Sequence, residues 1–402
     1  MMNVYVARQP IFNRKRKIFG YELLFRDGLS SAFPDIDGSI ATSKLLCGSF
    51  FSRGIERIVG RKKAFVNFTE EMLLEKTPTM LPKEKIMVEI LEDLEPRPEV
   101  INVCRQMAKS GYKLVLDDFV YREELEPLIA LSQIIKIDFR RDAIDLIEDN
   151  VKRLRPYRAK LLAEKVETHQ EFQQALDMGF DYFQGYFFSK PQILKSRDIS
   201  PSKIVLLQIM AEANREDFRV AELEKYIRRD VSISYKLMRY INSAYFGMIK
   251  KVSCIKQTIV LLGTKEVRRF LSLIAMAGLS SDKPDELVRT SLIRARLCEH
   301  LGTNDVGKDQ SELFTLGLFS LIDAILDDTM ENIMERLPLS EGIKSALVSG
   351  EGELWDYLNL ISCYEKGDWA EVSALAAKTG LGEENASSLY IDAVEWADSV
   401  PI

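Results

Sequence analysis

The first half of the chain carries short apolar runs that each end in a polar residue. The residues at the ends of six such runs are Asn67, Glu89, Asp117 with Asp118, Lys136, Glu164 and Gln184. They follow one another at steps of 19 to 28 residues, the length of one strand, loop, helix and return. In a closed barrel of parallel strands, the carboxyl ends of the strands meet on one face, where active sites are built. The pattern therefore predicts an α/β barrel over residues 1–192, with functional side chains on that face.

Two extended runs, residues 4–11 and 17–26, precede this series of apolar runs and are joined by a polar turn at 13–16. The basic cluster from Arg14 to Lys17 is open to two interpretations, a localisation or nucleic-acid patch and a solvated hairpin tip. The flanking extended runs favour the hairpin tip.

The pattern changes at Ser200-Pro201, which is typical of a helix start with proline in the first turn. Helical spacing then continues to about residue 378, with no convincing strand. Gly263-Thr264 fits a helix end followed directly by a new helix start. We therefore expect an all-α domain over residues 200–402, with its core at 200–340.

Composition narrows the class of protein. The chain of 402 residues is 46% apolar and 29% charged, as in ordinary globular proteins, and its net charge of −6 argues against a general nucleic-acid or membrane-surface binder. No apolar run is long enough to span a bilayer, and the N-terminus lacks a secretory pattern. Five scattered cysteines fit reduced thiols in a cytoplasmic protein. Because only two histidines are present, multi-histidine metal centres are excluded.

The polar strand ends point to cations. A single polar strand end has little meaning, but several carboxylates on one apolar face would repel each other unless cations lay among them. Alternate side chains of an extended strand share a face, so Glu22 and Arg26 would point together. On its own, that pair is better explained by a salt bridge at a strand end.

The segment Glu22-Leu23-Leu24-Phe25-Arg26 resembles the E-A-L-x-R motif of EAL domains, which hydrolyse or bind cyclic di-GMP. The resemblance spans residues 4–191 in the order of the family. Its further matches are Gln9-Pro10-Ile11, Asn67, Glu89-Ile90-Leu91-Glu92, Asp117-Asp118-Phe119, Lys136-Ile137-Asp138, residues 163–168 and Gln184-Gly185-Tyr186. The resemblance implies a TIM-like barrel of the EAL type.

The resemblance also implies a two-metal site. Glu22, Asn67, Glu89 and Asp117 are similar to the ligands of one Mg²⁺ or Mn²⁺, and Asp117 with Asp118 to those of a second ion. Such ions clamp the attacking water and the phosphodiester, and the implied product is the linear dinucleotide pGpG.

The resemblance implies roles for further residues of this chain. Lys136, Glu164 and Gln184 match catalytic positions beside the metals. Arg26 and Gln9 match substrate-binding positions. Glu167 matches a residue that supports the metal-site loop.

One segment departs from the family pattern. Active EAL enzymes have a glycine-rich Gly-Thr-Gly-Tyr-Ser segment after the Asp-Asp-Phe motif, whereas residues 120–124 here read Val-Tyr-Arg-Glu-Glu. Without glycine the backbone does not readily adopt a tight loop with positive φ. Lys165, where the family usually has glycine, is a second and milder change. Hydrolysis of cyclic di-GMP and binding without hydrolysis therefore both stay open, as does a scaffold role with a vestigial barrel.

Residues 200–300 resemble the HDOD domain, a helical relative of HD phosphohydrolases, with residues 241–247 as the distinctive match. The chain has no His-Asp dipeptide, and His300 is the only histidine of this half. This half is thus expected to be non-catalytic and to contact a protein partner. Arg268-Arg269 is interpreted as a solvated helix face that a partner could use.

Both halves together resemble the EAL–HDOD architecture of bacterial signalling proteins. This resemblance implies a cytoplasmic protein that binds cyclic di-GMP, and two divalent ions if it is active. It also implies that the HDOD domain contacts a protein partner. Neither a membrane nor direct DNA binding is expected, and a homodimer is the default expectation because EAL domains commonly pair. The sequence does not identify the partner, its pathway or the input signal.

Overall fold

The computed structural model describes residues 4–27, 51–141, 143–190, 255–280, 283–303, 309–379, 381 and 386–400, together with residues 206, 207, 210, 211 and 214. The predicted domain boundary at 191–200 and the motif at 241–247 lie outside these described residues.

The chain forms two compact units. The barrel unit contains Met1–Lys190 and Asn359–Glu395, and the helical unit contains Pro191–Leu358 and Trp396–Ile402. A segment near the C-terminus thus belongs to the same compact body as the barrel. The domain limits of 1–192 and 200–402 stay a prediction from the sequence.

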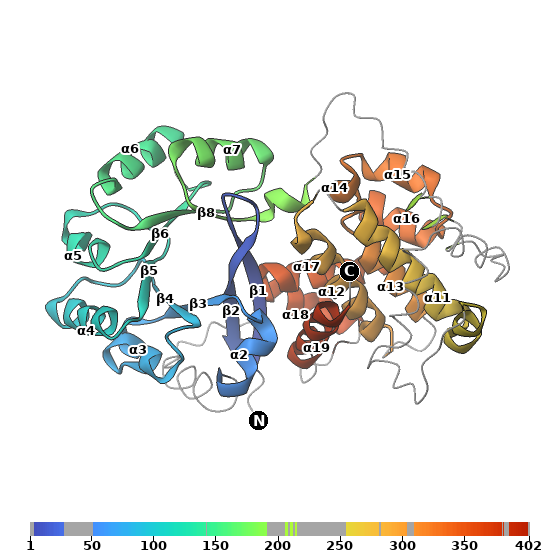
Figure 1. Cartoon of the computed structure of the whole chain (residues 1–402), viewed down its shortest axis with the longest axis horizontal. Coiled ribbons are helices and arrows are strands. Elements are labelled where there is room, and N and C mark those ends of the chain that lie inside the picture. The colour runs from blue at the N-terminus through green and yellow to red at the C-terminus, as the bar shows by residue number, and fades with distance from the viewer. Residues whose placement is uncertain are drawn as a thin grey trace. The chain divides into compact units, whose positions relative to one another are not determined.

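Eight strands close into a barrel in the order of the sequence (Figure 1). The strands are β1 Val4–Asn13, β2 Ile18–Asp27, β3 Lys63–Phe68, β4 Ile86–Ile90, β5 Lys113–Leu116, β6 Ile134–Asp138, β7 Lys160–Glu164 and β8 Tyr182–Gln184. The six predicted apolar runs are the six strands from β3 to β8. β1 is antiparallel to both neighbours, β2 and β8, and all other pairs are parallel. This follows from the predicted hairpin, whose turn reverses the chain before the parallel strands begin.

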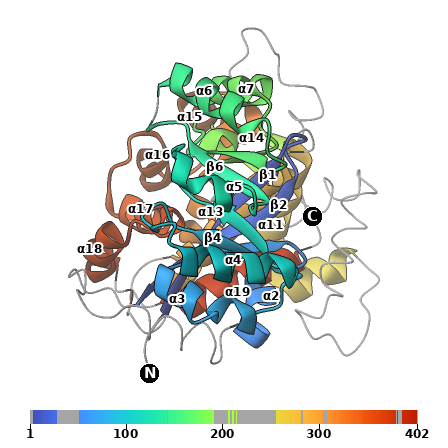
Figure 2. The same ribbon diagram turned by 90° about the vertical axis from the view of Figure 1, so that its left-hand side faces the viewer.

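Helices cover the outside of the strands, as Figure 2 shows for α3 to α7. They are α2 Phe51–Val59, α3 Glu70–Leu74, α4 Pro98–Lys109, α5 Glu126–Ile129, α6 Ile144–Leu154 and α7 His169–Met178. The start of α7 is a capping box, in which the Thr168 hydroxyl accepts from the Glu171 N–H and the Glu171 carboxylate accepts from the Thr168 N–H. Gly179, with φ 100°, ends the helix.

The barrel interior is filled by a layer of apolar side chains. One residue from nearly every strand contributes to it, namely Ile11, Phe65, Met87, Val115, Ile134, Leu162 and Tyr182. Side chains two residues apart on a strand share a face. The residues two positions after six of these therefore also point into the barrel, one layer nearer to the carboxyl ends of the strands. That next layer consists of Asn67, Glu89, Asp117, Lys136, Glu164 and Gln184.

The helical unit contains no strand among the residues that the structure describes. Its helices are α11 Ile255–Leu279, α12 Asp285–Leu301, α13 Gln310–Phe319, α14 Ile322–Leu326, α15 Met330–Arg336 and α16 Glu341–Val348, and α17 Glu353–Lys366 begins there. Gly263, with φ 74°, interrupts α11 at the predicted helix end. The prediction of a solvated Arg269 is wrong. Its guanidinium is buried and forms two hydrogen bonds to the Glu299 carboxylate, at 2.9 and 3.0 Å.

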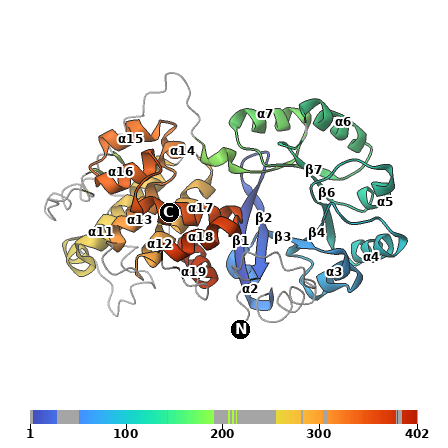
Figure 3. The ribbon, with the colours of Figure 1, turned by 180° about the vertical axis from the view of Figure 1, so that it is seen from behind.

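The C-terminal helices of the barrel unit are the end of α17, α18 Trp369–Thr379 and most of α19 Ala386–Ser399. Figure 3 shows the fold from behind, with β1 and β2 side by side.

Among the described residues, no helix has the length and apolar character needed to cross a membrane.

Candidate active site

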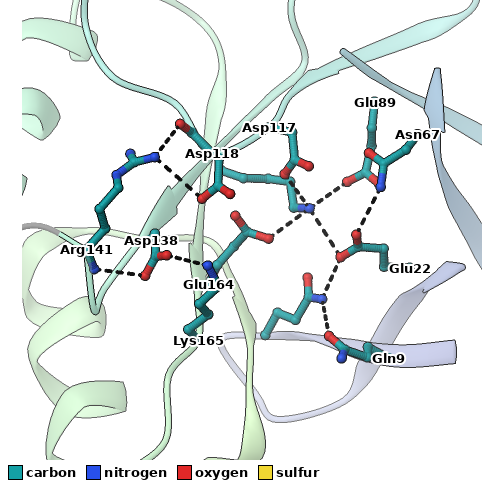
Figure 4. Close-up of polar contacts among 12 residues, drawn as sticks. Gln9, Glu22, Asn67, Glu89, Asp117, Asp118, Asp138, Arg141, Glu164 and Lys165 are labelled. Carbon is teal, nitrogen blue, oxygen red and sulfur yellow. Dashed lines mark hydrogen bonds and ion pairs between the residues drawn. The ribbon is translucent and has the colours of Figure 1, made fainter. Parts of the chain in front are cut away.

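A buried lysine lies at the centre of the polar layer in the barrel mouth. Lys136 Nζ is 2.8 Å from Glu89 Oε1, 2.7 Å from Asp117 Oδ1 and 2.8 Å from Glu164 Oε1. It also donates a hydrogen bond of 3.2 Å to Glu22 Oε2. The Lys136 side chain is 0% exposed. Three carboxylates from β2, β4 and β7 and a fourth directly after β5 thus converge on one ammonium group, and Figure 4 shows them facing one another.

Amide side chains fix the position of the Glu22 carboxylate. Gln184 Nε2 donates to Glu22 Oε2 at 2.6 Å and to Gln9 Oε1 at 2.9 Å. Asn67 Nδ2 donates to the other oxygen of Glu22 at 3.4 Å. Gln9 and Gln184 come from β1 and β8, the strands that close the barrel, so closure of the barrel itself orients Glu22.

A second polar group lies beside the first, at the loops after β5 to β7 (Figure 4). Arg141 donates to the main-chain oxygen of Asp118 at 2.9 Å, and Lys165 Nζ is 2.5 Å from Asp138 Oδ2. Asp118 and Lys165 have φ of 41° and 53°, in the left-handed region. Lys165 therefore adopts a backbone conformation that favours glycine.

Two of the predicted residues lie apart from the carboxylate group. Glu167 follows β7 and is 2.5 Å from an Arg140 guanidinium nitrogen and 3.2 Å from Lys190 Nζ. Arg26 pairs with Tyr5 in the β1–β2 register, but its side chain lies outside the described residues.

Burial shifts the ionisation of this layer. It raises the pKa of Glu89 well above its usual value, and the charges of Glu22 and Asp117 add to this rise. It raises the pKa of Glu164 to about 8, with Asp117 and Glu22 contributing further. Burial opposes the charge on Lys136, but the surrounding carboxylates outweigh it and hold the pKa of Lys136 well above its usual range.

The carboxylates of this layer contact Lys136 in the structure. Among the described residues, no group of three or more Asp, Glu, His or Cys side chains is spaced to hold a metal ion. However, Asn67 Oδ1, Asp117 Oδ1 and both carboxylate oxygens of Glu89 are buried without a hydrogen-bond partner, although Glu89 Oε1 and Asp117 Oδ1 form ion pairs with Lys136. Unpartnered carboxylate and amide oxygens are the donors that Mg²⁺ and Mn²⁺ prefer. The donor set therefore fits hard divalent cations.

The polar layer opens into a cavity of about 470 Å³. Glu22, Asp117, Glu164 and Gln184 line its base, and Tyr186 and Lys366 also contribute to its wall. Such a volume accommodates a small-molecule ligand of ordinary size.

Two family models match the chain, the EAL domain over residues 61–191 and the HDOD domain over residues 200–344. The cyclic di-GMP phosphodiesterase CdgJ of Vibrio cholerae is 39% identical over 404 residues, which cover 100% of this chain and 94% of that protein. The chain belongs to the EAL–HDOD family. The protein YuxH of Bacillus subtilis is 35% identical over 413 residues, which cover 99% of each chain.

Solved EAL structures are more distant relatives of this EAL–HDOD protein. An EAL domain protein from Listeria monocytogenes is 22% identical with a TM-score of 0.37, over 46% of this chain and 87% of that one. A standalone EAL protein from Vibrio cholerae O395, in its c-di-GMP bound form, is 24% identical with a TM-score of 0.39, over 47% of this chain and 92% of that one.

The family matches confirm the EAL–HDOD resemblance inferred from the motifs. The EAL match begins at residue 61, after β2, yet the structure places Glu22 of β2 in the same layer as Glu89 and Asp117. Sequence reasoning missed Asp138 as a site residue, although it lies two positions after Lys136 on the same strand. Arg141 and Lys366 were also missed, because no strand pattern places them.

Proposed function

We propose that the barrel unit of this EAL–HDOD protein binds cyclic di-GMP and hydrolyses one of its phosphodiesters to give pGpG. The observation that supports this most directly is the buried layer of converging carboxylates with unpartnered oxygens at the base of a cavity. The kinship with a cyclic di-GMP phosphodiesterase over the whole chain supports the choice of substrate.

In this proposal, Glu22, Asn67, Glu89 and Asp117 would hold one divalent ion, and Asp117 and Asp118 would help to hold a second. Bound ions of this kind lower the pKa of an attacking water and offset negative charge on the phosphodiester. The water oxygen bonds to phosphorus, the bond from phosphorus to the 3′ oxygen breaks, and that oxygen leaves as a hydroxyl. One phosphodiester thus becomes a 5′-phosphate.

The chain's own groups position these partners. Gln184 and Gln9 hold Glu22 through hydrogen bonds of 2.6 and 2.9 Å that form a chain across the barrel seam. Lys136 keeps a positive charge in the centre of the layer, where it offsets carboxylate charge and helps to hold the water. Glu164 contacts that ammonium from the next strand, and Glu167 supports the loop after β7.

The decisive experiment incubates the purified full chain with cyclic di-GMP and Mn²⁺ or Mg²⁺ and separates the products by chromatography. We expect pGpG from the wild type. Because Glu22 contributes to both the metal site and the Lys136 contacts, Glu22→Ala is expected to lower the rate by roughly a hundredfold or more. The control, Glu84→Gln, changes an exposed carboxylate and should leave the rate unchanged. Intact dinucleotide after long incubation, with metal shown to be bound, would reject hydrolysis.

A second candidate function is binding of cyclic di-GMP without hydrolysis. It is favoured by the segment 120–124, which has no glycine and in which the Val120 side chain is 46% exposed. Misalignment of the second ion by this segment would cost large factors in rate while leaving the strand-borne ligands in place. Binding of the dinucleotide in calorimetry, together with no pGpG in the hydrolysis assay, would support this function over hydrolysis. No affinity with or without metal would remove both functions.

The helical unit is proposed to be a non-catalytic HDOD domain that contacts a protein partner. The absence of a His-Asp dipeptide from the sequence supports this. His300, the only histidine of this half, lies in the last turn of α12. The homodimer and the cytoplasmic location stay predictions from the family resemblance.

A further inference from the structure

The turn between α17 and α18 packs against the strands that carry Glu22 and Gln9. Tyr364 Oη donates a buried hydrogen bond of 3.1 Å to the main-chain oxygen of Val6 in β1. Gln9 Nε2 donates to the main-chain oxygen of Lys366 at 3.4 Å. A Cβ on Gly367 would lie 2.8 Å from Leu24 Cδ1, so the turn is in close contact with β2. These contacts fix the Lys366 backbone beside the rim of the barrel mouth.

The Lys366 side chain lines the cavity that contains the polar layer. It belongs to the same wall as Tyr186, and its Nζ lies 5.8 Å from the centre of the Tyr186 ring. Tyr186 follows Gln184 by two residues at the end of β8. An exposed ammonium is thus held near an aromatic face, in the cavity whose base holds Glu22, Asp117 and Glu164.

Lys366 differs from the other cations that line this cavity. Arg140 is paired with Glu167 at 2.5 Å, and Lys165 is paired with Asp138 at 2.5 Å. Within the described part of the chain, Lys366 forms no ion pair within 4 Å. Its charge is therefore available to a ligand, whereas the charges of Arg140 and Lys165 are already offset by carboxylates.

The ligand that fits an uncompensated ammonium on the cavity wall is an anion. We propose that Lys366 binds a phosphodiester oxygen of the cyclic dinucleotide through its ammonium group. This inference rests on the proposed function, because it takes the same ligand in the same cavity. One phosphodiester lies at the base of the cavity near the carboxylate layer, and Lys366 at the wall neutralises negative charge of the ligand near the rim.

The inference assigns a substrate contact to a residue far outside the EAL match at 61–191. The C-terminal segment Asn359–Glu395 thereby completes the binding site of the barrel. A charge-assisted hydrogen bond of this kind strengthens binding by roughly tenfold. Because the contact persists from ground state to transition state, its loss raises KM and leaves kcat nearly unchanged.

The test compares wild type, Lys366→Gln, Lys366→Arg and the control Lys109→Gln in steady-state hydrolysis of cyclic di-GMP and in calorimetric titration with it. Lys109 is an exposed lysine at the C-terminal end of α4 and does not line the cavity, so its replacement reproduces the charge change alone. Lys366→Gln is expected to raise KM and Kd about tenfold with kcat within about twofold. Lys366→Arg should restore most of the affinity, and Lys109→Gln should match the wild type.

Salt gives an independent readout. Raising the ionic strength should weaken binding to the wild type more than binding to Lys366→Gln, because the lost contact is ionic. Equal KM and Kd in wild type and Lys366→Gln would overturn the inference while the proposed function stands. A wild type that neither binds nor hydrolyses the dinucleotide would overturn both. Unchanged thermal unfolding of Lys366→Gln, expected for an exposed side chain, excludes misfolding as the cause of a loss.

Discussion

In the buried barrel mouth, Lys136 offsets the negative charge of the carboxylates, as solvent and counter-ions do at an exposed site. One ammonium group contacts four carboxyl groups and offsets the negative charge that they carry inside the barrel mouth. Burial of a charge costs free energy, and only a close partner of opposite charge offsets this cost. Removal of one partner therefore destabilises the protein by more than the ion pair contributes to stability in total, because the other charge stays buried without compensation. In the metal-free chain, the stability of the barrel mouth therefore depends on this single side chain.

Replacement of Lys136 by methionine, which has a similar shape and no charge, is expected to lower the free energy of unfolding by about 3–5 kcal/mol in chelator-containing buffer. Urea denaturation followed by circular dichroism measures this. Mg²⁺ or Mn²⁺ should then stabilise Lys136→Met more than the wild type, because a divalent ion replaces the missing charge. Equal unfolding midpoints for the two proteins, with and without metal, would contradict this account.

Most residues of the polar layer can be predicted from the sequence. Asn67, Glu89 and Glu164 lie within one residue of the carboxyl ends of their strands, and the alternation of side chains places them inside the barrel with the apolar layer beneath. Asp138 obeys the same rule. Arg141 and Lys366 do not, because each reaches the site from a loop or turn whose path is set by long-range packing rather than by local periodicity.

At the scale of elements, the shortest strand shows how tightly the barrel mouth is built. β8 is followed by Gly185, whose φ is 142° and whose added Cβ would lie 2.1 Å from Val166 O. In the native backbone, Val166 N–H donates to Gln184 O at 3.0 Å and Phe187 N–H donates to Val166 O at 3.1 Å. The loop after β7 and the end of β8 are thus in backbone contact, and a side chain at position 185 would separate them.

Gly185→Ala is expected to destabilise the chain by about 3 kcal/mol or more, because both the positive φ and the backbone contact oppose a Cβ. Gly179→Ala is the matched control. It also has positive φ, but no atom lies within 4 Å of its added Cβ, so a loss of about 1 kcal/mol is expected. Chemical denaturation of both variants measures the difference. Similar losses would show that the close approach at Val166 has no energetic weight.

The elements themselves were predictable to different degrees. Strands β3 to β8 were predicted because each is a short buried run with a polar end and a helix behind it. The hairpin was predicted from its polar turn. The pairing of β1 with β8 was not, since closure of a barrel joins residues that are distant in sequence and leaves no local mark.

At the scale of the whole molecule, the chain returns to the barrel unit after leaving it. Helical spacing predicted helices up to about residue 378, and α17 and α18 confirm this near the end of that range. The same spacing does not reveal which body such a helix packs on, because an apolar face fits any apolar surface of suitable shape. The packing of Asn359–Glu395 with the barrel is therefore seen in the structure but could not be predicted from the sequence pattern.

Tyr364→Phe tests this placement. It removes the hydroxyl that donates to Val6 O and is expected to lower the free energy of unfolding by about 1 kcal/mol, because a buried acceptor loses its partner. Tyr121→Phe removes an exposed hydroxyl contact to Glu126 and should cost less than about 0.5 kcal/mol. Parity between the two variants in urea denaturation would argue against a buried contact between this segment and β1.

The pairing of β1 with β8 also constrains how the protein is made. Ile11 lies opposite Gln184, so the first strand of the barrel to be synthesised cannot complete its pairing until the last strand of the barrel has been made. At translation rates of 5–20 residues per second, that delay is roughly 10 seconds or longer. Throughout this interval the nascent hairpin exposes an unpaired edge, the kind of surface on which chains aggregate or recruit chaperones.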